Sequence, residues 1–400
     1  MNVVSLNDKI HKRSGHIAVP YKNTMIVWGG YMERVLESDL EITYSVYHHT
    51  DELWIYNGIN DSWFRILTHG DIPPMVSGCC GLICKDRLYT FGGHLNMQEN
   101  NDFGGAVNNL FCLDLLTRKW THLTPSGKEP LACDKLVGWV YKEKLYFFGG
   151  FGLAPRRYYP FDHVPESEDT RWSIGWNNQF VCYNIKENCW EWPQTKGTLP
   201  LPRAAHSADI TGHLVYVFGG RLRHIRNNEL YCLNMETMKW SDNLIDQTLR
   251  TGFEVPEGRT WHSFTFISPN QAVLYGGLSQ HNAVLSDCWI LNVKHGGRSV
   301  QWETLGTDWN HPLLWHKSVC IPATGDVLIH GGLKRSLLAL STTNNHAEDL
   351  LILYFKPPSL LRLALNSVCS NFKQLENHIT SLPKVLQTIV RRRIVMKTTQ

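Results

Sequence analysis

The sequence predicts an all-β fold, a six-bladed β-propeller followed by a short C-terminal α-helical segment. The first observation is that a Gly-Gly doublet closes a short apolar strand six times, at a spacing of roughly 50 to 70 residues. The second is that a tryptophan follows the next strand at a fixed distance in the first four units. Such units bury their faces only against neighbouring units, which is how propeller blades are built. The doublets are Gly29-Gly30, Gly92-Gly93, Gly149-Gly150, Gly219-Gly220, Gly276-Gly277 and Gly331-Gly332.

Each unit predicts four strands. A first strand turns through a polar pair into a second, which ends in the doublet, where backbones crowd near the axis and a side chain would clash. A third strand follows a variable loop. A tryptophan opens the fourth strand, and it lies seven positions after the last residue of the third strand. These pairs are Tyr56 with Trp63, Leu113 with Trp120, Tyr183 with Trp190, and Leu233 with Trp240. The doublet with its downstream aromatic residues is typical of kelch blades.

The last two units depart from this pattern. The fifth stretches it to Trp302, and the sixth has a third strand at residues 350–355 and then no tryptophan. Because an unpaired sheet edge is costly, we expect residues 3–6 to supply the missing outer strand and close the ring. The predicted propeller therefore covers residues 1–356, and the helical segment covers residues 357–400.

The C-terminal segment has helical periodicity. Ser359 is a plausible N-cap, and Leu361, Leu365, Val368 and Phe372 recur at spacings of four, three and four, which predicts a helix over residues 359–373. Ser381-Leu382-Pro383 starts a second helix. The apolar faces of these helices need a partner, either the propeller wall or another protein.

Composition excludes several classes. A formal charge of +3 over 400 residues argues against a general nucleic-acid or membrane-surface binder. No apolar run approaches the roughly 18 residues that span a bilayer, and no leader-like segment begins the chain. The 11 cysteines contain no Cys-x-x-Cys pair, which favours reduced core thiols. We expect a soluble intracellular protein of the nucleus or cytoplasm, without nucleic-acid or membrane partners.

Loops at one face of the ring predict a binding site. The residues just before each first strand and just after each doublet are aromatic and cationic; they include Tyr31, Phe151, Trp261 and Trp315 with Lys135, Arg203, Arg221 and Arg226. Apolar walls beside guanidinium groups suit a small anion on an apolar stem, such as a peptide C-terminus. Arg203 shares its register with Arg13 and Arg259 and is expected to belong partly to the blade framework. The recurring histidine at the first-strand start is expected to be structural, bonding the backbone of its own blade.

Catalysis is not expected. The chain has no Gly-x-Ser-x-Gly, no phosphate loop and no His-Glu-x-x-His. Kelch propellers also occur in copper-radical oxidases, but those need a Tyr-Cys pair and histidine ligands on the axis of a secreted protein. We therefore predict a non-enzyme with no cofactor and no metal.

The mouth sequences resemble one kelch family closely. They are similar to those of the family of kelch domain-containing proteins 1 and 2, the substrate receptors of cullin-2 RING ubiquitin ligases, over nearly the whole chain. The segments that carry the resemblance are Arg13-Ser14-Gly15-His16, Asp134-Lys135-Leu136, Gly175-Trp176-Asn177, Arg203-Ala204-Ala205-His206, Phe218-Gly219-Gly220-Arg221 through Arg226, Gly258-Arg259-Thr260-Trp261-His262 and Leu314-Trp315-His316.

The resemblance implies capture of protein C-termini that end in Gly-Gly. It assigns the α-carboxylate to Arg221, Arg226 and Thr260, and the pocket walls to Tyr31, Lys135, Phe151, Trp176, Trp261 and Trp315. The family usually has Tyr at Phe151, Ser at Thr260 and Arg near Leu313, so selectivity beyond the last residues is expected to differ.

The tail carries a second resemblance. Ser359, Leu360, Ala364 and Val368 are similar to an Elongin-binding box, with Ala364 where Cys is common, and Leu382-Pro383 resembles a short cullin-2 box. The implied function is the substrate-recognition subunit of a cullin-2 ligase with Elongin B and Elongin C. The alternative is a kelch scaffold that binds an internal segment of a cytoskeletal or nuclear protein.

Overall fold

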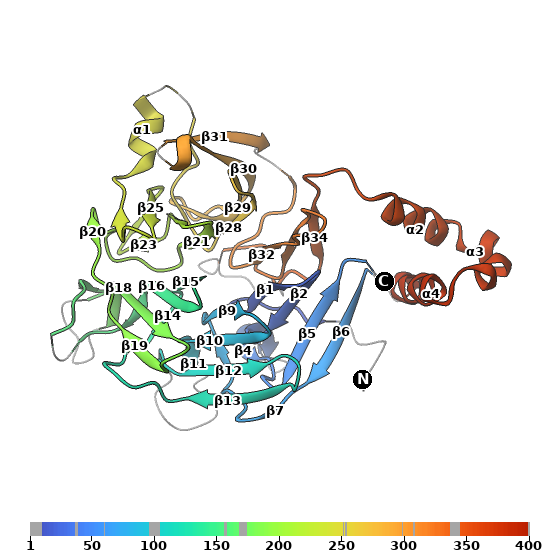
Figure 1. Cartoon of the computed structure of the whole chain (residues 1–400), viewed down its shortest axis with the longest axis horizontal. Coiled ribbons are helices and arrows are strands. Elements are labelled where there is room, and N and C mark those ends of the chain that lie inside the picture. Colours follow the sequence, from blue (N-terminus) through green and yellow to red (C-terminus); the bar gives the residue numbers. More distant parts are fainter. Residues whose placement is uncertain are drawn as a thin grey trace.

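The fold is a six-bladed β-propeller with a helical tail, as the sequence predicts (Figure 1). The computed structural model describes residues 10–36, 39–59, 61–95, 105–155, 158–167, 174–250, 252, 254–297, 299–306, 309–336 and 345–398. Among these residues, no helix is long and apolar enough to cross a membrane.

Blades 1 to 3 each contain four consecutive antiparallel strands and short accessory strands. Blade 1 has β1 (Ile17–Tyr21), β2 (Thr24–Trp28), β5 (Glu52–Asn57) and β6 (Ser62–Leu67), with a hairpin of β3 (Tyr31–Leu36) and β4 (Asp39–Tyr47). Blade 2 has β9 (Cys80–Cys84), β10 (Arg87–Phe91), β12 (Leu110–Asp114) and β13 (Lys119–Leu123), with β7 (His69–Gly70), β8 (Val76–Ser77) and β11 (His94–Leu95). Blade 3 has β15 (Val137–Tyr141), β16 (Lys144–Leu153), β18 (Ile174–Asn184) and β19 (Cys189–Glu191), with β14 (Cys133–Asp134) and β17 (His163–Pro165).

Blades 4 and 5 repeat the design, and the described residues of blade 6 form three strands. Blade 4 has β21 (Ser207–Thr211), β22 (Leu214–Phe218), β25 (Leu230–Asn234) and β26 (Lys239–Trp240), with β20 (Lys196–Gly197), β23 (Arg221–Leu222), β24 (Ile225–Arg226) and helix α1 (Leu244–Arg250). Blade 5 has β28 (Ser263–Ser268), β29 (Gln271–Ser279), β30 (Val284–Lys294) and β31 (Ser299–Gly306), with β27 (Arg259–Thr260) and the 3₁₀ turn η1 (His295–Gly297). Blade 6 has β32 (Lys317–Cys320), β33 (Val327–His330) and β34 (Leu350–Leu353); the predicted closing strand, residues 3–6, lies outside the described residues.

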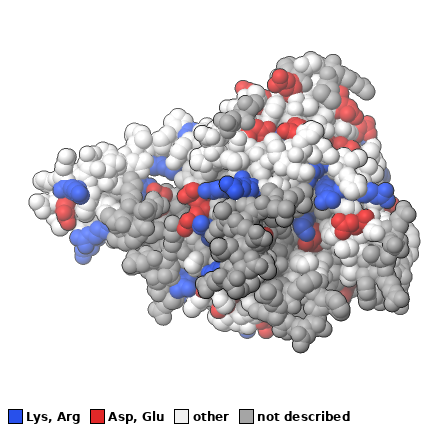
Figure 2. Space-filling model, turned by 180° about the vertical axis from the view of Figure 1, so that it is seen from behind, with Lys and Arg blue, Asp and Glu red and all other residues white. Residues whose placement is uncertain are grey.

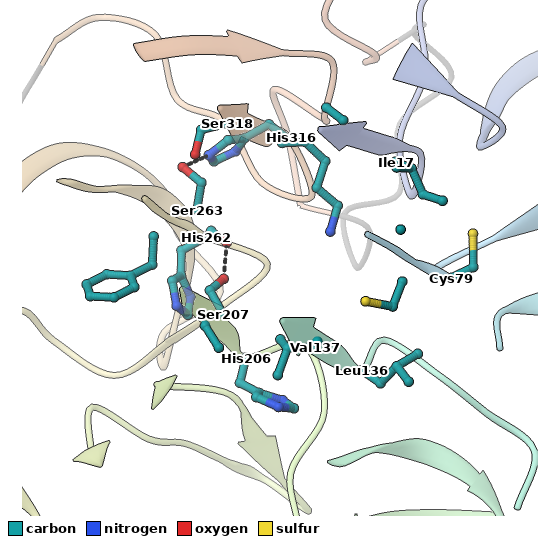
Figure 3. A pocket seen from close by; sticks show the side chains of 17 residues that line it. Ile17, Cys79, Leu136, Val137, His206, Ser207, His262, Ser263, His316 and Ser318 are labelled. Atoms are coloured by element: carbon teal, nitrogen blue, oxygen red, sulfur yellow. Dashed lines mark hydrogen bonds between the residues drawn. The ribbon is translucent and has the colours of Figure 1, made fainter. Parts of the chain in front are cut away.

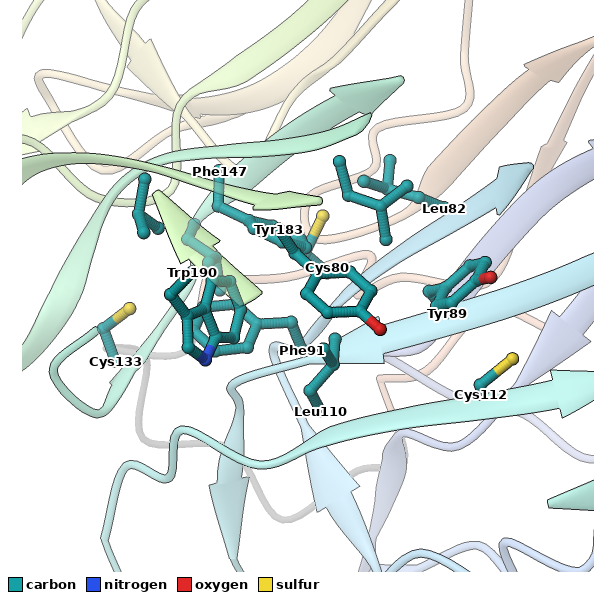
Figure 4. Packing of buried hydrophobic residues seen from close by; sticks show 13 residues of the cluster. Cys80, Leu82, Tyr89, Phe91, Leu110, Cys112, Cys133, Phe147, Tyr183 and Trp190 are labelled. Atoms are coloured by element: carbon teal, nitrogen blue, oxygen red, sulfur yellow. The ribbon is translucent and has the colours of Figure 1, made fainter. Parts of the chain in front are cut away.

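The spacing of seven residues before each tryptophan is explained by strand pairing. Tyr56 faces Trp63 across β5 and β6, and the three other pairs face each other in the same way in blades 2, 3 and 4. Trp302 takes the corresponding place in blade 5, opposite Leu291. These rings fill the space between blades: Trp190 packs against Phe91 and Phe147 at centroid distances of 5.2 and 6.2 Å (Figure 4).

The Gly-Gly doublets are required because the recurring histidines pack directly against them. A Cβ on Gly219 would lie 2.7 Å from the ring of His262 in the next blade, and a Cβ on Gly220 would lie 2.8 Å from the Cβ of its own blade's His206. The histidines are thus structural, but the expected bond to the backbone of their own blade is wrong. Among the described residues, no hydrogen bond joins the ring of His16, His206 or His262 to the backbone of its own blade, and each ring packs on the preceding blade instead.

The same contact closes the ring. A Cβ on Gly331 in blade 6 would meet the ring of His16 in blade 1 at 2.5 Å, and strand β32 lies against β1. A further core cluster spans this junction, with Met25, Trp54 and Leu328 among its buried residues. The first and last blades are therefore packed as closely as any other neighbours.

The tail protrudes from the ring beside blades 6 and 1 (Figure 1). It comprises α2 (Leu360–Ser370), α3 (Phe372–Leu375), the 3₁₀ helix η2 (Glu376–Ser381) and α4 (Lys384–Thr398). Ser359 is the N-cap of α2, since its hydroxyl accepts a hydrogen bond from the Arg362 amide. The helix ends three residues earlier than the sequence predicts, because Asn371 leaves the helical conformation and its side chain donates to the Ser367 carbonyl.

Two arginines fix the tail to the propeller. Arg362 bonds Asp326 of the loop before β33 and donates to the Tyr354 hydroxyl at 3.0 Å. Arg393, buried in α4, donates to the Ile59 carbonyl of blade 1 at 3.1 Å and to Asn366 of α2 at 2.8 Å. The tail thus has a defined position against the blade 6 to blade 1 junction.

Candidate binding site at the mouth of the channel

A ring of six left-handed residues surrounds the mouth. Each blade contributes one residue with a φ between 54° and 67°. This residue directly precedes the position, at the start of the first strand, where four of the blades have histidine. The amide of each donates to the carbonyl of its counterpart in the preceding blade at 2.7 to 2.9 Å in five successive steps. The members are Gly15, Gly78, Lys135, Ala205, Trp261 and Trp315.

Four members of this ring are not glycine, although a left-handed backbone costs a residue with a Cβ of the order of 1 kcal/mol. Three of them, Lys135, Trp261 and Trp315, are residues that the sequence assigned to the pocket walls. A Cβ on Gly15 would lie 3.1 Å from the Trp315 indole, so the glycine leaves space for that ring. Strained backbone of this kind gathers at ligand sites, which favours a binding role for the mouth.

Two guanidinium groups lie together on blade 4. Arg221 and Arg226 face each other across the hairpin of β23 and β24. The guanidinium of Arg221 lies 5.5 Å from the Trp176 ring, and its Nε donates to the Arg223 carbonyl. Arg226 donates from Nη2 to Asn282 at 2.8 Å, while its Nε is buried without a partner among the described residues. Burial, and then the charge of Arg221, lowers the pKa of Arg226.

The framework arginines are bonded differently. Arg203 and Arg259 are fully buried, and each donates to the carbonyl of the first glycine of its own doublet at 3.0 Å. Their charges are compensated, by Glu229 at 2.7 Å for Arg203 and by Asp287 at 2.6 and 2.8 Å for Arg259. Neither Arg221 nor Arg226 has a carboxylate partner in the described part of the chain. The sequence interpretation of Arg203 as a framework residue is therefore correct.

One wall of the mouth comes from blade 3. Phe151 and Trp176 are cross-strand partners in β16 and β18, and their rings meet edge to face at 5.2 Å. The Lys135 ammonium lies 5.7 Å from the Phe151 ring and 5.9 Å from the Trp315 ring, and it bonds the carboxylate of Asp134. That pair is close to neutral, so it adds little net charge to the mouth.

The opposite wall is aromatic. Trp261 and Trp315 lie 5.5 Å apart, and Tyr31 meets Trp315 edge to face at 5.6 Å. Burial raises the pKa of the Tyr31 hydroxyl, so it stays neutral. The structure thus brings the six predicted wall residues and both arginines to one end of the ring.

Thr260 is more buried than its implied role in binding the peptide carboxylate would require. It lies in β27, paired with Leu278, and its side chain has no exposed surface. Its hydroxyl has no hydrogen-bond partner among the described residues, and neither does the indole nitrogen of Trp261 next to it. Buried donors without a partner are uncommon in proteins, but the framework residues His206 and Trp240 have them too, so this feature alone does not mark a binding site.

Several residues of the site escaped the sequence reasoning. Asn282 and Gln280 reach Arg226 from blade 5: the Gln280 side chain accepts from the Arg226 amide at 2.7 Å. Nothing in the local sequence signals this contact. The ring of left-handed residues did have a signal, because Gly15 and Gly78 share one register.

The tail presents apolar side chains at the start of α2. Leu360 is 84 % exposed, and Leu361 and Ala364 are exposed beside it. Val368 and Leu382 instead pack partly into a small core within the tail around Leu365 and Val390. Of the predicted adaptor residues, Ser359 and Pro383 are exposed as well.

Surface charge is mixed, and the described residues form no metal cluster. On the face behind that of Figure 1, basic and acidic side chains are interspersed (Figure 2). Within the described ranges, no group of three or more His, Cys, Asp or Glu side chains is placed to hold a metal ion. All 11 cysteines are free, and most are buried.

The fold and the aromatic, cationic mouth define a kelch-type propeller of the class that binds other proteins. The chain matches the KLHDC2/KLHL20/DRC7 Kelch-repeats domain over residues 15–246 and 169–361, and it belongs to that family. It is 36 % identical over 393 residues to Kelch domain-containing protein 1 of Mus musculus, covering 95 % of this chain and 90 % of the relative. It is 35 % identical over 400 residues to Kelch domain-containing protein 2 of Homo sapiens, covering 96 % and 90 %. The solved structure titled "Structure of YjhT" shares the fold, with a TM-score of 0.62 at 12 % identity, covering 88 % of this chain and 98 % of that one.

Proposed function

We propose that the mouth binds the free C-terminus of another protein, with Gly-Gly as its last residues. On this proposal the chain is the substrate-recognition subunit of a cullin-2 RING ubiquitin ligase and joins it through Elongin B and Elongin C. It presents targets for ubiquitination and carries out no catalysis of its own.

The observation that carries the proposal is the contrast between two kinds of arginine in one blade. Arg203 is buried and compensated by Glu229, whereas Arg221 and Arg226 stand side by side without a carboxylate among the described residues. Two adjacent guanidinium groups repel each other, and a carboxylate between them relieves that repulsion through charge-assisted hydrogen bonds. A ligand carboxylate is the missing partner.

The aromatic walls account for the preference for glycine. Trp176 lies 5.5 Å from the Arg221 guanidinium, and Trp261 and Trp315 of blades 5 and 6 lie 5.5 Å from each other. We call Arg221 and Arg226 the clamp. An aromatic ring so close to the clamp leaves little space for a Cβ on the last residues of a peptide, so residues larger than glycine are excluded. Walls of this kind also remove water from the ion pair, which strengthens it.

Binding of matched peptides tests the clamp. A peptide that ends in Gly-Gly-COOH should bind, and its C-terminal amide should bind at least about a hundredfold more weakly, because charge-assisted bonds would be left unmade. The Arg221→Ala, Arg226→Ala double variant should lose the difference between acid and amide. Lys196→Ala, Lys239→Ala is the control, because those residues are an exposed cation pair facing each other on the outer edge of the same blade.

Equal affinity of the acid and the amide for the wild type would overturn the proposal. That result would favour the alternative function, a kelch scaffold that binds an internal segment of a cytoskeletal or nuclear protein.

Co-purification tests the adaptor role separately. Leu360 at the start of α2 is exposed, so Leu360→Asp should leave the fold intact and abolish co-purification with Elongin B and Elongin C. Leu116→Asp is the matched control, since Leu116 is 68 % exposed on the propeller. Co-purification of the Leu360→Asp variant at the wild-type level would refute this role.

A further inference from the structure

A cavity of about 140 Å³ lies on the propeller axis, lined by the first strands of all six blades. Its walls combine apolar side chains from blades 1 to 3 with polar ones from blades 4 to 6 (Figure 3). Ile17, Leu136 and Val137 represent the first group, and Ser207, Ser263 and Ser318 the second. This axial cavity is distinct from the mouth, since none of the predicted mouth residues lines it.

The polar half contains one charged group. Burial keeps the pKa of His206 and of His316 at about 3 and that of His262 well below its usual range, so these rings are neutral at physiological pH. Among the described lining residues there is no carboxylate, and Lys317 is the one side chain that carries a charge. The axial cavity is therefore cationic.

Lys317 stands out from its counterparts in the other blades. The same register position, one residue after the first-strand start, holds Ile17, Cys80, Val137, Ser207 and Ser263. A lysine is longer than any of these, and its charge reaches groups on other blades. Burial is the main cause of the low pKa of His16 and His206, and the Lys317 ammonium adds to it from blade 6.

The ammonium has no anionic partner in the part of the chain that the structure describes. No hydrogen bond or ion pair joins Lys317 to another of the described residues, and burial lowers the pKa of its own ammonium. The Lys317 side chain is only partly buried, so its unpaired ammonium is open to the axial cavity. An anion that enters the axial cavity can therefore pair with this charge.

Hydroxyl groups surround the same space. Ser263 shares a hydrogen bond of 2.9 Å with His316, and Ser318 shares one of 2.5 Å with Thr265. Ser207 donates to the His262 carbonyl at 2.6 Å. The first two hydroxyls can reorient, accepting from their present partner and donating toward the axis. One ammonium and two hydroxyl donors are groups that bind small oxyanions.

We propose that the axial cavity binds one small inorganic oxyanion, of the size and charge of phosphate, on the Lys317 ammonium. The anion neutralises the lysine and links blade 6 to the first strand of blade 5, which carries Ser263. The site does not depend on the proposed function of the mouth, because its residues and its ligand are different.

Equilibrium dialysis of the full chain against labelled inorganic phosphate tests this inference. The wild type should bind one equivalent, and Lys317→Met should weaken binding at least about tenfold, as expected for a lost charged hydrogen bond. Lys317→Gln provides a second variant if the methionine form folds poorly. Lys239→Met, an exposed lysine on blade 4, is the control and should bind as the wild type does.

The arginine variant separates the axial cavity from the mouth. Arg221→Ala, Arg226→Ala should keep its phosphate equivalent while losing peptide binding. The inference is overturned if the wild type binds no phosphate, if Lys317→Met binds it as well as the wild type does, or if binding disappears only in the arginine variant.

Discussion

Arg221 and Arg226 face each other across a two-stranded turn on blade 4, and a side chain from the next blade holds one of them in place. Arg226 donates to the Asn282 side chain at 2.8 Å, in a loop of blade 5. The clamp is therefore assembled across a blade boundary. Its geometry depends on how the two blades pack, as well as on the hairpin that carries both arginines.

Removing Asn282 should weaken the clamp without unfolding the protein. Asn282 has a φ of 62°, so Asn282→Gly fits the backbone and removes only the side chain. We expect a loss of roughly five- to tenfold in affinity for a Gly-Gly acid peptide. This is the effect expected from losing one hydrogen bond between a charged donor and a neutral acceptor. Isothermal titration with acid and amide peptides checks this, and an equal loss for both peptides would show that Asn282 does not act through the carboxylate.

Ring closure should be sensitive to one methyl group. In Gly331→Ala, the new Cβ would lie 2.5 Å from the Arg13 carbonyl and 2.5 Å from the His16 ring, on a backbone with a φ of 67°. We expect a loss of more than about 3 kcal/mol, seen as a large fall in melting temperature. Gly212→Ala is the matched control. Its φ is 60° and nothing lies within 4 Å, so only backbone strain of about 1 kcal/mol should appear.

The buried ion pair of blade 5 should matter more than an exposed one. Asp287 accepts from both terminal nitrogens of Arg259 and from the Trp289 indole at 2.7 Å. Asp287→Asn leaves a buried guanidinium uncompensated, which should cost about 3 to 5 kcal/mol. Glu143→Gln breaks the exposed pair with Lys85 and should cost less than about 1 kcal/mol. Equal melting temperatures for the two variants would contradict this assignment.

The blade architecture was predictable because its signals are local. The seven-residue step from Tyr56 to Trp63 sets one hairpin and its cross-strand pair, and the doublet at Gly219-Gly220 marks the point where two backbones meet. Each of these sequence signals lies within a single unit of the chain, although the histidine that packs on Gly219 comes from the next blade. Repetition then extends them around the ring.

The sequence predicted which residues reach the mouth, but not how deeply they are buried or which side chains they contact. Which residues reach the mouth follows from register, as for Trp261 and Trp315. The burial of Thr260 and the contact between Arg226 and Asn282 follow from the packing of one blade on the next, over 56 residues of sequence in the second case. The compensation of Arg259 by Asp287 likewise depends on a fold that brings distant strands together.

Acid should destabilise the protein through its buried histidines. Burial, and then the charge of Arg13, lowers the pKa of His330 to about 3, while an unfolded histidine titrates near 6.5. In this pH range the unfolded chain binds a proton at this histidine and the folded chain does not. The free energy of unfolding therefore falls as the pH drops from about 6.5 toward 3. Each such group contributes a slope of about 1.4 kcal/mol per pH unit in this window.

Replacing this histidine should flatten that dependence. His330 is buried against Trp63 and His16, with ring centroids at 5.0 and 5.3 Å, so His330→Phe keeps the packing and removes the titrating group. Melting temperatures measured from pH 7.5 to 4.5 should fall less steeply for this variant than for the wild type. His378→Gln, an exposed histidine of the tail, should leave the wild-type slope unchanged. If His330→Phe and the wild type lose stability in parallel, the buried ring takes up its proton without cost and the acid sensitivity arises elsewhere.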